Sequence, residues 1–322
     1  MTKLEKLRNE YKSWGRWYYH LVLDSLGGRN LFYDREEYVN GMNIVALAQF
    51  LTKMGVIQFD WMRNHGHFIV LATGLQCCNF FDYSRYRLNA RLIKDDYPPL
   101  PDAWFFKLIR LDTFDELVNA VSYSARNSYD AMADILPGGY LCSSNYLMFS
   151  NIRDVIDYRT VAEIGTRGMI RLLGSNVKLP SSYKVCKLGF VLPESYLLKT
   201  EDGSMTKVRS LYKDSKDYAY HLFRDYDTYR RVASDIGEEW IPNGKDANVL
   251  IRNIVEVNYG VNDIKSLNAD NRCDLAVTLG TRYGLKAEEI ASRLNLSSSM
   301  VSKLLYSYKK KNKNPEWKKR TL

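Results

Sequence analysis

The stretch VIQFDWMRNHGHFIVLA (Val56–Ala72) decides the fold of the first part of this chain. Its two ends, Val56–Arg63 and His67–Ala72, are short apolar runs typical of β-strands. We therefore expect a strand pair. Side chains two positions apart in a strand point to the same face, so His65 and His67 would share a face and could bind one cation. A pair of histidines on the polar face of a half-exposed strand is the competing interpretation.

The neighbouring segments supply the other expected elements of a sheet domain. WYYHLVLD (Trp17–Asp24) reads as a buried strand, and Asp34 precedes a helical pattern over Arg35–Met54. Thr113 is a suitable N-cap for a second helix that reaches about Asp134. The order β-α-β-β-α predicts an α+β fold with helices on one face of the sheet.

The second expected helix carries a candidate nucleophile. Tyr123 and Asn127 are four residues apart, so they lie on the same helical face. A tyrosine nucleophile needs a nearby cation, because a phenol with a pKa of ~10 is mostly protonated at neutral pH. The carboxamide oxygen of Asn127 could complete the coordination of that cation. Tyr123 alone indicates little, because the chain has 24 tyrosines.

These residues resemble a known family. From about Trp14 to Phe149 the chain is similar to the single-tyrosine HUH transposases, specifically the REP-associated tyrosine transposases. The histidines precede the tyrosine as in that family, whereas relaxases of the same superfamily have the reverse order. The matching segments are Tyr18–Val22 followed by Gly27-Gly28-Arg29, Met62–Val70, Tyr123–Ser128, and the Tyr-x-x-Ser-Ser pattern of Tyr140–Ser144.

The resemblance implies a fold and an activity. It implies a ferredoxin-like catalytic domain with an antiparallel sheet over residues 1–150, often used as a homodimer. It implies that Tyr123 is the catalytic nucleophile and that His65, His67 and Asn127 hold Mg²⁺ or Mn²⁺. Single-stranded or hairpin DNA would then be cleaved and rejoined through a 5′-phosphotyrosine.

Three positions depart from the family pattern. Arg63 and Ser128 replace prolines, and Gly66 replaces a bulky apolar residue between the histidines. A catalytically weak, domesticated DNA-binding regulator is therefore the alternative function. A replication-initiation nickase would share the same chemistry.

The basic charge of the chain is concentrated near its C-terminus. The formal net charge is +9, with 46 Lys and Arg against 37 Asp and Glu. Residues 271–322 hold 12 of the former and 4 of the latter, a balance of +8, so the rest carries 34 − 33 = +1. This distribution predicts a polyanion-binding region. A solvated cationic tail is the competing interpretation.

The same region has the pattern of a helix-turn-helix. Helices are expected over Asn271–Gly284 and Ala287–Leu294, and Ser297 is a suitable N-cap for a third helix that reaches about Tyr308. A small three-helix packing or dimerisation unit is the alternative. A recognition helix contacts bases with its N-terminal residues, and a basic continuation contacts phosphates. The expected contacts with double-stranded DNA are Ser298, Ser299, Ser302, Lys303, Lys309, Lys310 and Lys311.

Between these parts, residues 151–270 are expected to form a mostly helical connecting region. It holds a strand-like segment, Tyr183–Leu198, and a helical pattern over Met205–Asp235. Closer to the N-terminus, Arg85, Arg87 and Arg91 could guide single-stranded DNA beside aromatic residues.

The composition indicates the cellular compartment of the protein. The five cysteines form no Cys-x-x-Cys pair, which argues against a disulfide framework or a cysteine zinc site. No apolar run approaches the ~18 residues of a membrane span, and the first residues lack the apolar segment of a secretory signal. We expect a cytoplasmic, nucleoid-associated protein with no membrane partner.

Overall fold

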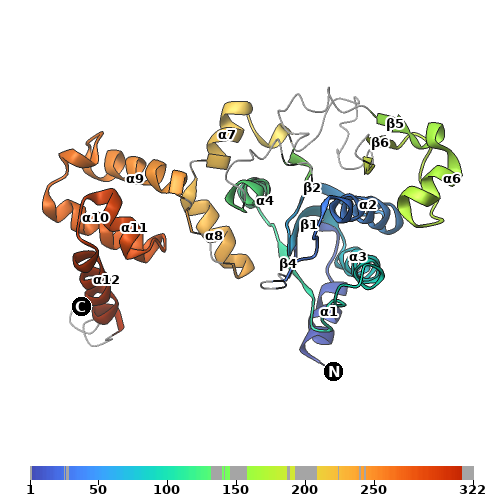
Figure 1. The fold of residues 1–322 in the computed structure, drawn as a ribbon, viewed down its shortest axis with the longest axis horizontal. Helices are drawn as coiled ribbons and strands as arrows, with labels where there is room; N and C mark the ends of the chain where they lie inside the picture. The colour runs from blue at the N-terminus through green and yellow to red at the C-terminus, as the bar shows by residue number, and fades with distance from the viewer. Residues whose placement is uncertain are drawn as a thin grey trace. The chain divides into compact units, whose positions relative to one another are not determined.

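The computed structural model divides the chain into two compact units, Met1–Leu222 and Phe223–Leu322 (Figure 1). The predicted connecting region is split between them, because the elements up to α7 group with the first unit and α8 and α9 group with the second. The structure describes residues 2–24, 26, 29–131, 140, 142–145, 158–186, 189–192, 209–223, 225–238, 241–242 and 244–313. Gly27 and Gly28 lie outside the described residues.

The first unit is built around a four-stranded antiparallel sheet with the order β2-β3-β1-β4. On the interior strand β3, His67 lies opposite Val22 of β1 and opposite Asp60 of β2. The strands are β1 (Trp17–Leu23), β2 (Gly55–Trp61), β3 (Gly66–Ala72) and β4 (Phe106–Arg110).

One face of this sheet is apolar and forms the main core. Helices α1 (Lys3–Lys12), α2 (Arg35–Thr52) and α3 (Gly74–Lys94) contribute side chains to that core. Large side chains from successive strands meet there because opposite residues of antiparallel strands share a face. The sheet residues in this core are Tyr19, Leu21, Leu23, Val56, Phe59, Trp61, Phe68, Val70, Ala72, Phe106 and Leu108.

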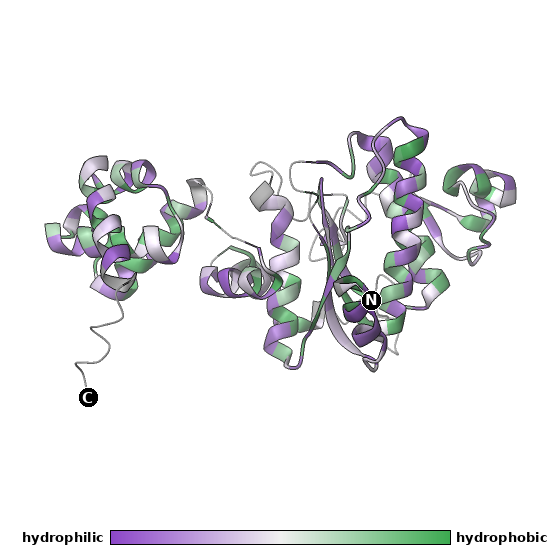
Figure 2. Ribbon diagram, turned by 90° about the horizontal axis from the view of Figure 1, so that it is seen from below, coloured by the Kyte–Doolittle hydropathy of each residue, from purple (hydrophilic) through white to green (hydrophobic). Residues whose placement is uncertain are grey.

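The other face of the sheet is polar and is covered by α4 (Phe114–Ala131). In Figures 1 and 2 the sheet lies between α4 on one side and α2 and α3 on the other. The expectation of helices on one face is therefore wrong, because the polar residues of the strands are themselves buried and need a second layer. Those buried residues are His20, Gln58, Asp60 and His67.

The local signals at the predicted helices are confirmed by their caps. The Asp34 carboxylate accepts from the Glu37 amide at 2.9 Å at the start of α2. The Thr113 hydroxyl accepts from the Glu116 amide at 3.1 Å at the start of α4. The strands predicted to begin at Trp17, Val56 and His67 are also confirmed, although the second ends at Trp61 and not at Arg63. Helix α3 and strand β4 were not expected, although α3 carries buried residues at helical spacing.

A second, smaller sheet is attached to the outer side of α2. It has the order β5-β6-β7 and packs with α6 (Val161–Leu173). The Asn43 side chain of α2 makes two hydrogen bonds with the backbone at the start of β7. It donates to the Gly189 carbonyl at 3.1 Å and accepts from the Val191 amide at 2.9 Å. The strands are β5 (Tyr158–Thr160), β6 (Lys184–Cys186) and β7 (Val191–Leu192).

The single helix expected over Met205–Asp235 is wrong. The described part forms a 3-10 turn, η4 (Arg209–Leu211), and two helices, α7 (Ser215–Phe223) and α8 (Tyr226–Ile236). Asp225 separates the two helices because its carboxylate accepts from the Thr228 amide at 3.3 Å and so begins a new helix.

The second unit is entirely helical over its described residues. Val301 of α12 is buried, as are Ile290 and Leu294 of α11. Asn295, with φ 54°, ends α11, and the Ser297 hydroxyl accepts from the Met300 amide at 3.2 Å to begin α12. The elements after α8 are α9 (Gly244–Tyr259), η5 (Ile264–Ser266), α10 (Ala269–Arg282), α11 (Ala287–Leu294) and α12 (Ser298–Lys313).

Gly66, between the two histidines of β3, makes room for an aromatic ring. A Cβ at this position would lie 2.7 Å from Cε3 of Trp61 and 3.0 Å from Cε2 of Phe68. The indole is fully buried, and its Nε1 donates to the Gly41 carbonyl at 3.2 Å, which fixes its position. The side chain missing at Gly66 is therefore replaced by the ring of Trp61.

We expect Gly66→Ala to lower the free energy of unfolding by about 1–3 kcal/mol, because the new methyl group overpacks the core. The double variant Gly66→Ala/Trp61→Leu should lose less unfolding free energy than the sum of the losses in the two single variants. Urea unfolding of the four proteins measures the coupling. Gly15→Ala is the matched control, because no atom lies within 4 Å of a Cβ at Gly15. Strictly additive effects of the two changes would contradict this packing argument.

Candidate functional site

Three of the four histidines meet on the polar face of the sheet. His67, the second residue of β3, is completely buried, and His20 of β1 is 1% exposed. The ring centroids of His20 and His67 are 5.3 Å apart, and those of His65 and His67 are 4.9 Å apart. One ring nitrogen of His65 lies within 4.8 Å of one of His67. The expected sharing of a face by His65 and His67 is therefore observed.

Burial keeps these imidazoles neutral. Desolvation lowers the pKa of His20 to about 3 and that of His65 to about 4, and it lowers the pKa of His67 well below its usual range. A neutral imidazole offers a nitrogen lone pair, which is the form that binds metals.

A hydrogen bond sets the tautomer of His65. Its Nδ1 lies 2.8 Å from Oδ1 of Asn64. Because a carboxamide oxygen only accepts, Nδ1 of His65 carries the proton in this arrangement and Nε2 keeps its lone pair. His65 is thus prepared to act as a ligand through Nε2.

Helix α4 places Tyr123 against the histidines. The Tyr123 ring centroid lies 5.7 Å from that of His67 and 6.4 Å from that of His20, in edge-on arrangements. Tyr123 is 3% exposed. One turn further, Nδ2 of Asn127 is buried without a hydrogen-bond partner among the described residues. Candidate residues from the strand motif and the helix motif therefore lie on the same side of the sheet.

Contacts from later segments hold α4 in place. Hydroxyl oxygens of Ser122 and Tyr212 are 2.8 Å apart. The guanidinium of Arg126, which is 1% exposed, donates to the Leu222 carbonyl near the end of α7. Such bonds to the last carbonyls of a helix stabilise its C-terminal end. Part of the predicted connecting region thus supports the helix that carries Tyr123.

A buried polar network lies beside the histidines and was not expected. Asn145 donates from Nδ2 to Oδ2 of Asp60 at 3.3 Å and to the Ala125 carbonyl at 3.2 Å, and it accepts from Nε2 of Gln58 at 3.0 Å. Burial raises the pKa of Asp60 well above its usual range. Asn145 follows the Tyr-x-x-Ser-Ser pattern, whose described residues run along β2 through backbone bonds. The sequence signal for this network is the spacing of the polar residues Gln58 and Asp60, two positions apart in an otherwise apolar strand.

The three arginines proposed for single-stranded DNA lie on α3, on the apolar side of the sheet. Each is bonded to its own chain. Arg85 donates to the Pro101 carbonyl at 3.1 Å, Arg87 donates to the Leu173 carbonyl at 2.6 Å, and Arg91 pairs with Asp95. The structure does not bring them together with His65, His67 and Tyr123.

In the second unit, the candidate DNA contacts lie on α12. Most of these side chains are exposed, and Ser298 is half-buried. The exposed ones are Ser299, Ser302, Lys303, Lys309 and Lys310; the side chain of Lys311 lies outside the described residues, as does the basic segment 314–322.

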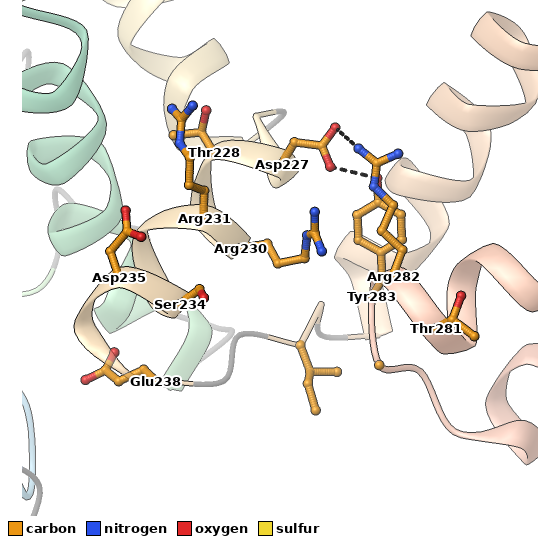
Figure 3. A pocket seen from close by; sticks show the side chains of 12 residues that line it. Asp227, Thr228, Arg230, Arg231, Ser234, Asp235, Glu238, Thr281, Arg282 and Tyr283 are labelled. Atoms are coloured by element: carbon orange, nitrogen blue, oxygen red, sulfur yellow. Dashed lines mark hydrogen bonds and ion pairs between the residues drawn. The ribbon is translucent and has the colours of Figure 1, made fainter. Parts of the chain in front are cut away.

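The second unit also contains an open cavity of about 650 Å³ between α8 and the end of α10 (Figure 3). Asp227 binds Arg282 at 2.7 Å and accepts from the Tyr283 hydroxyl at 3.1 Å. The lining of the cavity contains equal numbers of basic and acidic side chains: Arg230, Arg231 and Arg282, and Asp227, Asp235 and Glu238. This balance favours no ligand of one charge sign.

Comparisons of the chain with protein-family models, with curated proteins and with solved structures gave no match. Among the described residues, no helix has the length and apolarity needed to cross a membrane.

Burial of neutral His20 predicts a loss of stability in acid. Its pKa is about 3 in the folded protein, against ~6.5 in an unfolded chain, so the unfolded state binds the extra proton as pH falls below ~6.5. The contribution of His20 to the free energy of unfolding then falls by up to ~1.4 kcal/mol for each unit by which the pH is lowered. Asp60 titrates in the opposite sense, because its pKa is raised.

The difference between wild type and His20→Gln isolates this contribution. Urea unfolding between pH 7 and pH 4.5 should show a shallower loss of stability in the variant, because glutamine does not titrate. Parallel pH dependences for the two proteins would show that His20 is not buried in its neutral form.

Proposed function

We propose that this chain is a metal-dependent enzyme that cleaves and rejoins DNA strands, of the single-tyrosine HUH transposase type. The observation that carries the proposal is the meeting of His65, His67 and Tyr123 on one face of the sheet. These residues come from two separate sequence motifs, one around the histidines and one around Tyr123. An antiparallel sheet with helices on both faces supports the expected α+β architecture.

The donor set fits a divalent metal. His65 and His67 are neutral imidazoles with ring nitrogens close together, and Asn127 has a buried amide group one turn after Tyr123 on α4. These three residues would hold Mg²⁺ or Mn²⁺. A bound divalent ion would polarise a phosphodiester oxygen and stabilise negative charge in the transition state.

Tyr123 would supply the nucleophile. Its hydroxyl oxygen forms a bond to phosphorus as the bond from phosphorus to the 3′ oxygen breaks. The phenol proton is lost, and the departing 3′ oxygen gains one to become a hydroxyl. Attack by a 3′ hydroxyl on the 5′-phosphotyrosine reverses these changes and rejoins strands. Since Tyr123 is 3% exposed, the reaction requires its hydroxyl to become accessible to the strand.

The second unit would bind double-stranded DNA. Helix α11 has the expected bounds, whereas α10 begins and ends earlier than expected, at Ala269 and Arg282, and α12 extends past Tyr308 to Lys313. The exposed side chains near the start of α12 suit contacts with base edges. Single-stranded or hairpin DNA at the first unit, a homodimer and association with the nucleoid belong to the same proposal.

Replacing Tyr123 with phenylalanine should abolish covalent capture of DNA. We expect wild-type protein with Mn²⁺ and a labelled single-stranded hairpin library to give a protein–DNA adduct on a denaturing gel. Tyr123→Phe should give none, because it lacks the hydroxyl. Tyr86→Phe is the matched control, since Tyr86 is 70% exposed on α3. An adduct of equal yield with Tyr123→Phe would refute the assignment.

A regulator would behave differently in the same experiment. Without any adduct from wild type, but with salt-sensitive binding of DNA by both proteins, the chain would be a non-catalytic DNA-binding protein.

Reversing the charge of Lys303 should weaken binding of double-stranded DNA. Lys303→Glu removes a cation from the exposed face of α12, so the slope of log affinity against log salt should fall by about 1. Fluorescence anisotropy at several salt concentrations measures this slope. Lys12→Glu makes the same charge change at an exposed position of α1 and should leave the slope nearly unchanged. Equal effects of the two variants would show that α12 does not specifically contact DNA.

A further inference from the structure

His20 touches the candidate metal site without belonging to its expected ligand set. Its Nε2 lies 3.1 Å from Nδ1 of His67, and both side chains are buried. We propose that His20 is a positioning residue, which accepts a hydrogen bond from Nδ1–H of His67 and so keeps Nε2 of His67 available for a metal. This inference rests on the metal site of the proposed function.

The chemistry of two neutral imidazoles allows only two arrangements of the shared proton. If His20 donated it, His67 would carry its own proton on Nε2 and would lose the lone pair there. If His67 donates it, the proton stays on Nδ1 and Nε2 of His67 keeps its lone pair. Metal-binding histidines are held in this way by an acceptor on the other ring nitrogen.

Asn64 already plays the corresponding part for His65. There Nδ1 lies 2.8 Å from a carboxamide oxygen, so the proton is on Nδ1. If His20 accepts from His67, both ligands of the pair have the same tautomer, with both Nε2 atoms available. The two histidines of β3 would thus be prepared by one acceptor from the preceding turn and one from the neighbouring strand.

The sheet fixes His20 in this position. Its strand partners are Ile69 of β3 and Ile109 of β4, so it lies on an interior strand, diagonally adjacent to His67. The Tyr123 ring meets the edges of both imidazoles at 6.4 Å and 5.7 Å between centroids. Rotation of either ring is therefore restricted by its neighbours.

His20 is poorly placed to be a ligand itself. Among the described residues, the group of ligand atoms within 4.8 Å of one another that contains His65 and His67 does not include His20. Its Nε2 is directed at His67, so the role assigned to it is to orient another residue.

Nuclear magnetic resonance of the metal-free, full-length chain reads the tautomer directly. Long-range ¹H–¹⁵N spectra distinguish a protonated from an unprotonated ring nitrogen for each ¹⁵N-labelled histidine. We expect the proton of His67 on Nδ1 in wild type. His20→Gln retains an acceptor oxygen and should preserve this tautomer, whereas His20→Leu should lose it.

Titration with Mn²⁺ tests the consequence. We expect His20→Leu to raise the Kd for Mn²⁺ by 10–100-fold, the usual effect of losing such a partner, and His20→Gln to restore most of the affinity. His221→Leu is the matched control, because His221 lies on α7 and is paired with Asp217 at 3.8 Å. It should leave the Kd unchanged.

The outcomes separate this inference from the proposed function. A proton on Nε2 of His67 in wild type overturns it, even if His20→Leu fails to fold. So does an unchanged Kd for Mn²⁺ in a folded His20→Leu protein. The expected tautomer and Mn²⁺ binding without any covalent DNA adduct would support the role of His20 and refute the nuclease activity.

Discussion

The antiparallel register between β1 and β3 is the constraint on which the rest of the site depends. Pairing His67 with Val22 places His20 two residues along the same face, within hydrogen-bond distance of His67. A shift by one residue would turn every side chain of β1 to the opposite face. It would put His20 into the apolar core and Leu21 among the polar groups, so the register that builds the core also builds the site.

Burying so many polar groups is costly unless each finds a partner. The structure meets part of this need from distant parts of the chain: Asn145 bonds Asp60 and the Ala125 carbonyl of α4, and Tyr212 bonds Ser122 of α4. These contacts position α4 over the histidines. The polar face is therefore a hydrogen-bonded interior, which differs from the solvated surface that a half-exposed strand would have.

Much of this arrangement could be predicted from local sequence patterns. The two strands around the histidines, the caps at Asp34 and Thr113, and the turn at Asn295 follow from short-range chemistry. Asp60 and Asn145 were not found, because their importance lies in a tertiary bond between residues far apart in sequence. The sequence also does not reveal that the arginines of α3 lie on the opposite side of the sheet from the histidines, because proximity in sequence does not determine which side of a sheet a helix covers.

Trp61 and Gly66 illustrate how packing limits the paths that sequence change can take. The indole occupies the space where a side chain between the two histidines would project. A bulky side chain cannot simply be added at position 66 while the indole remains. Position 61 has to become smaller first or at the same time. The two positions therefore form an epistatic pair, and the order of substitutions in any lineage leading to or from this sequence is constrained by a single ring.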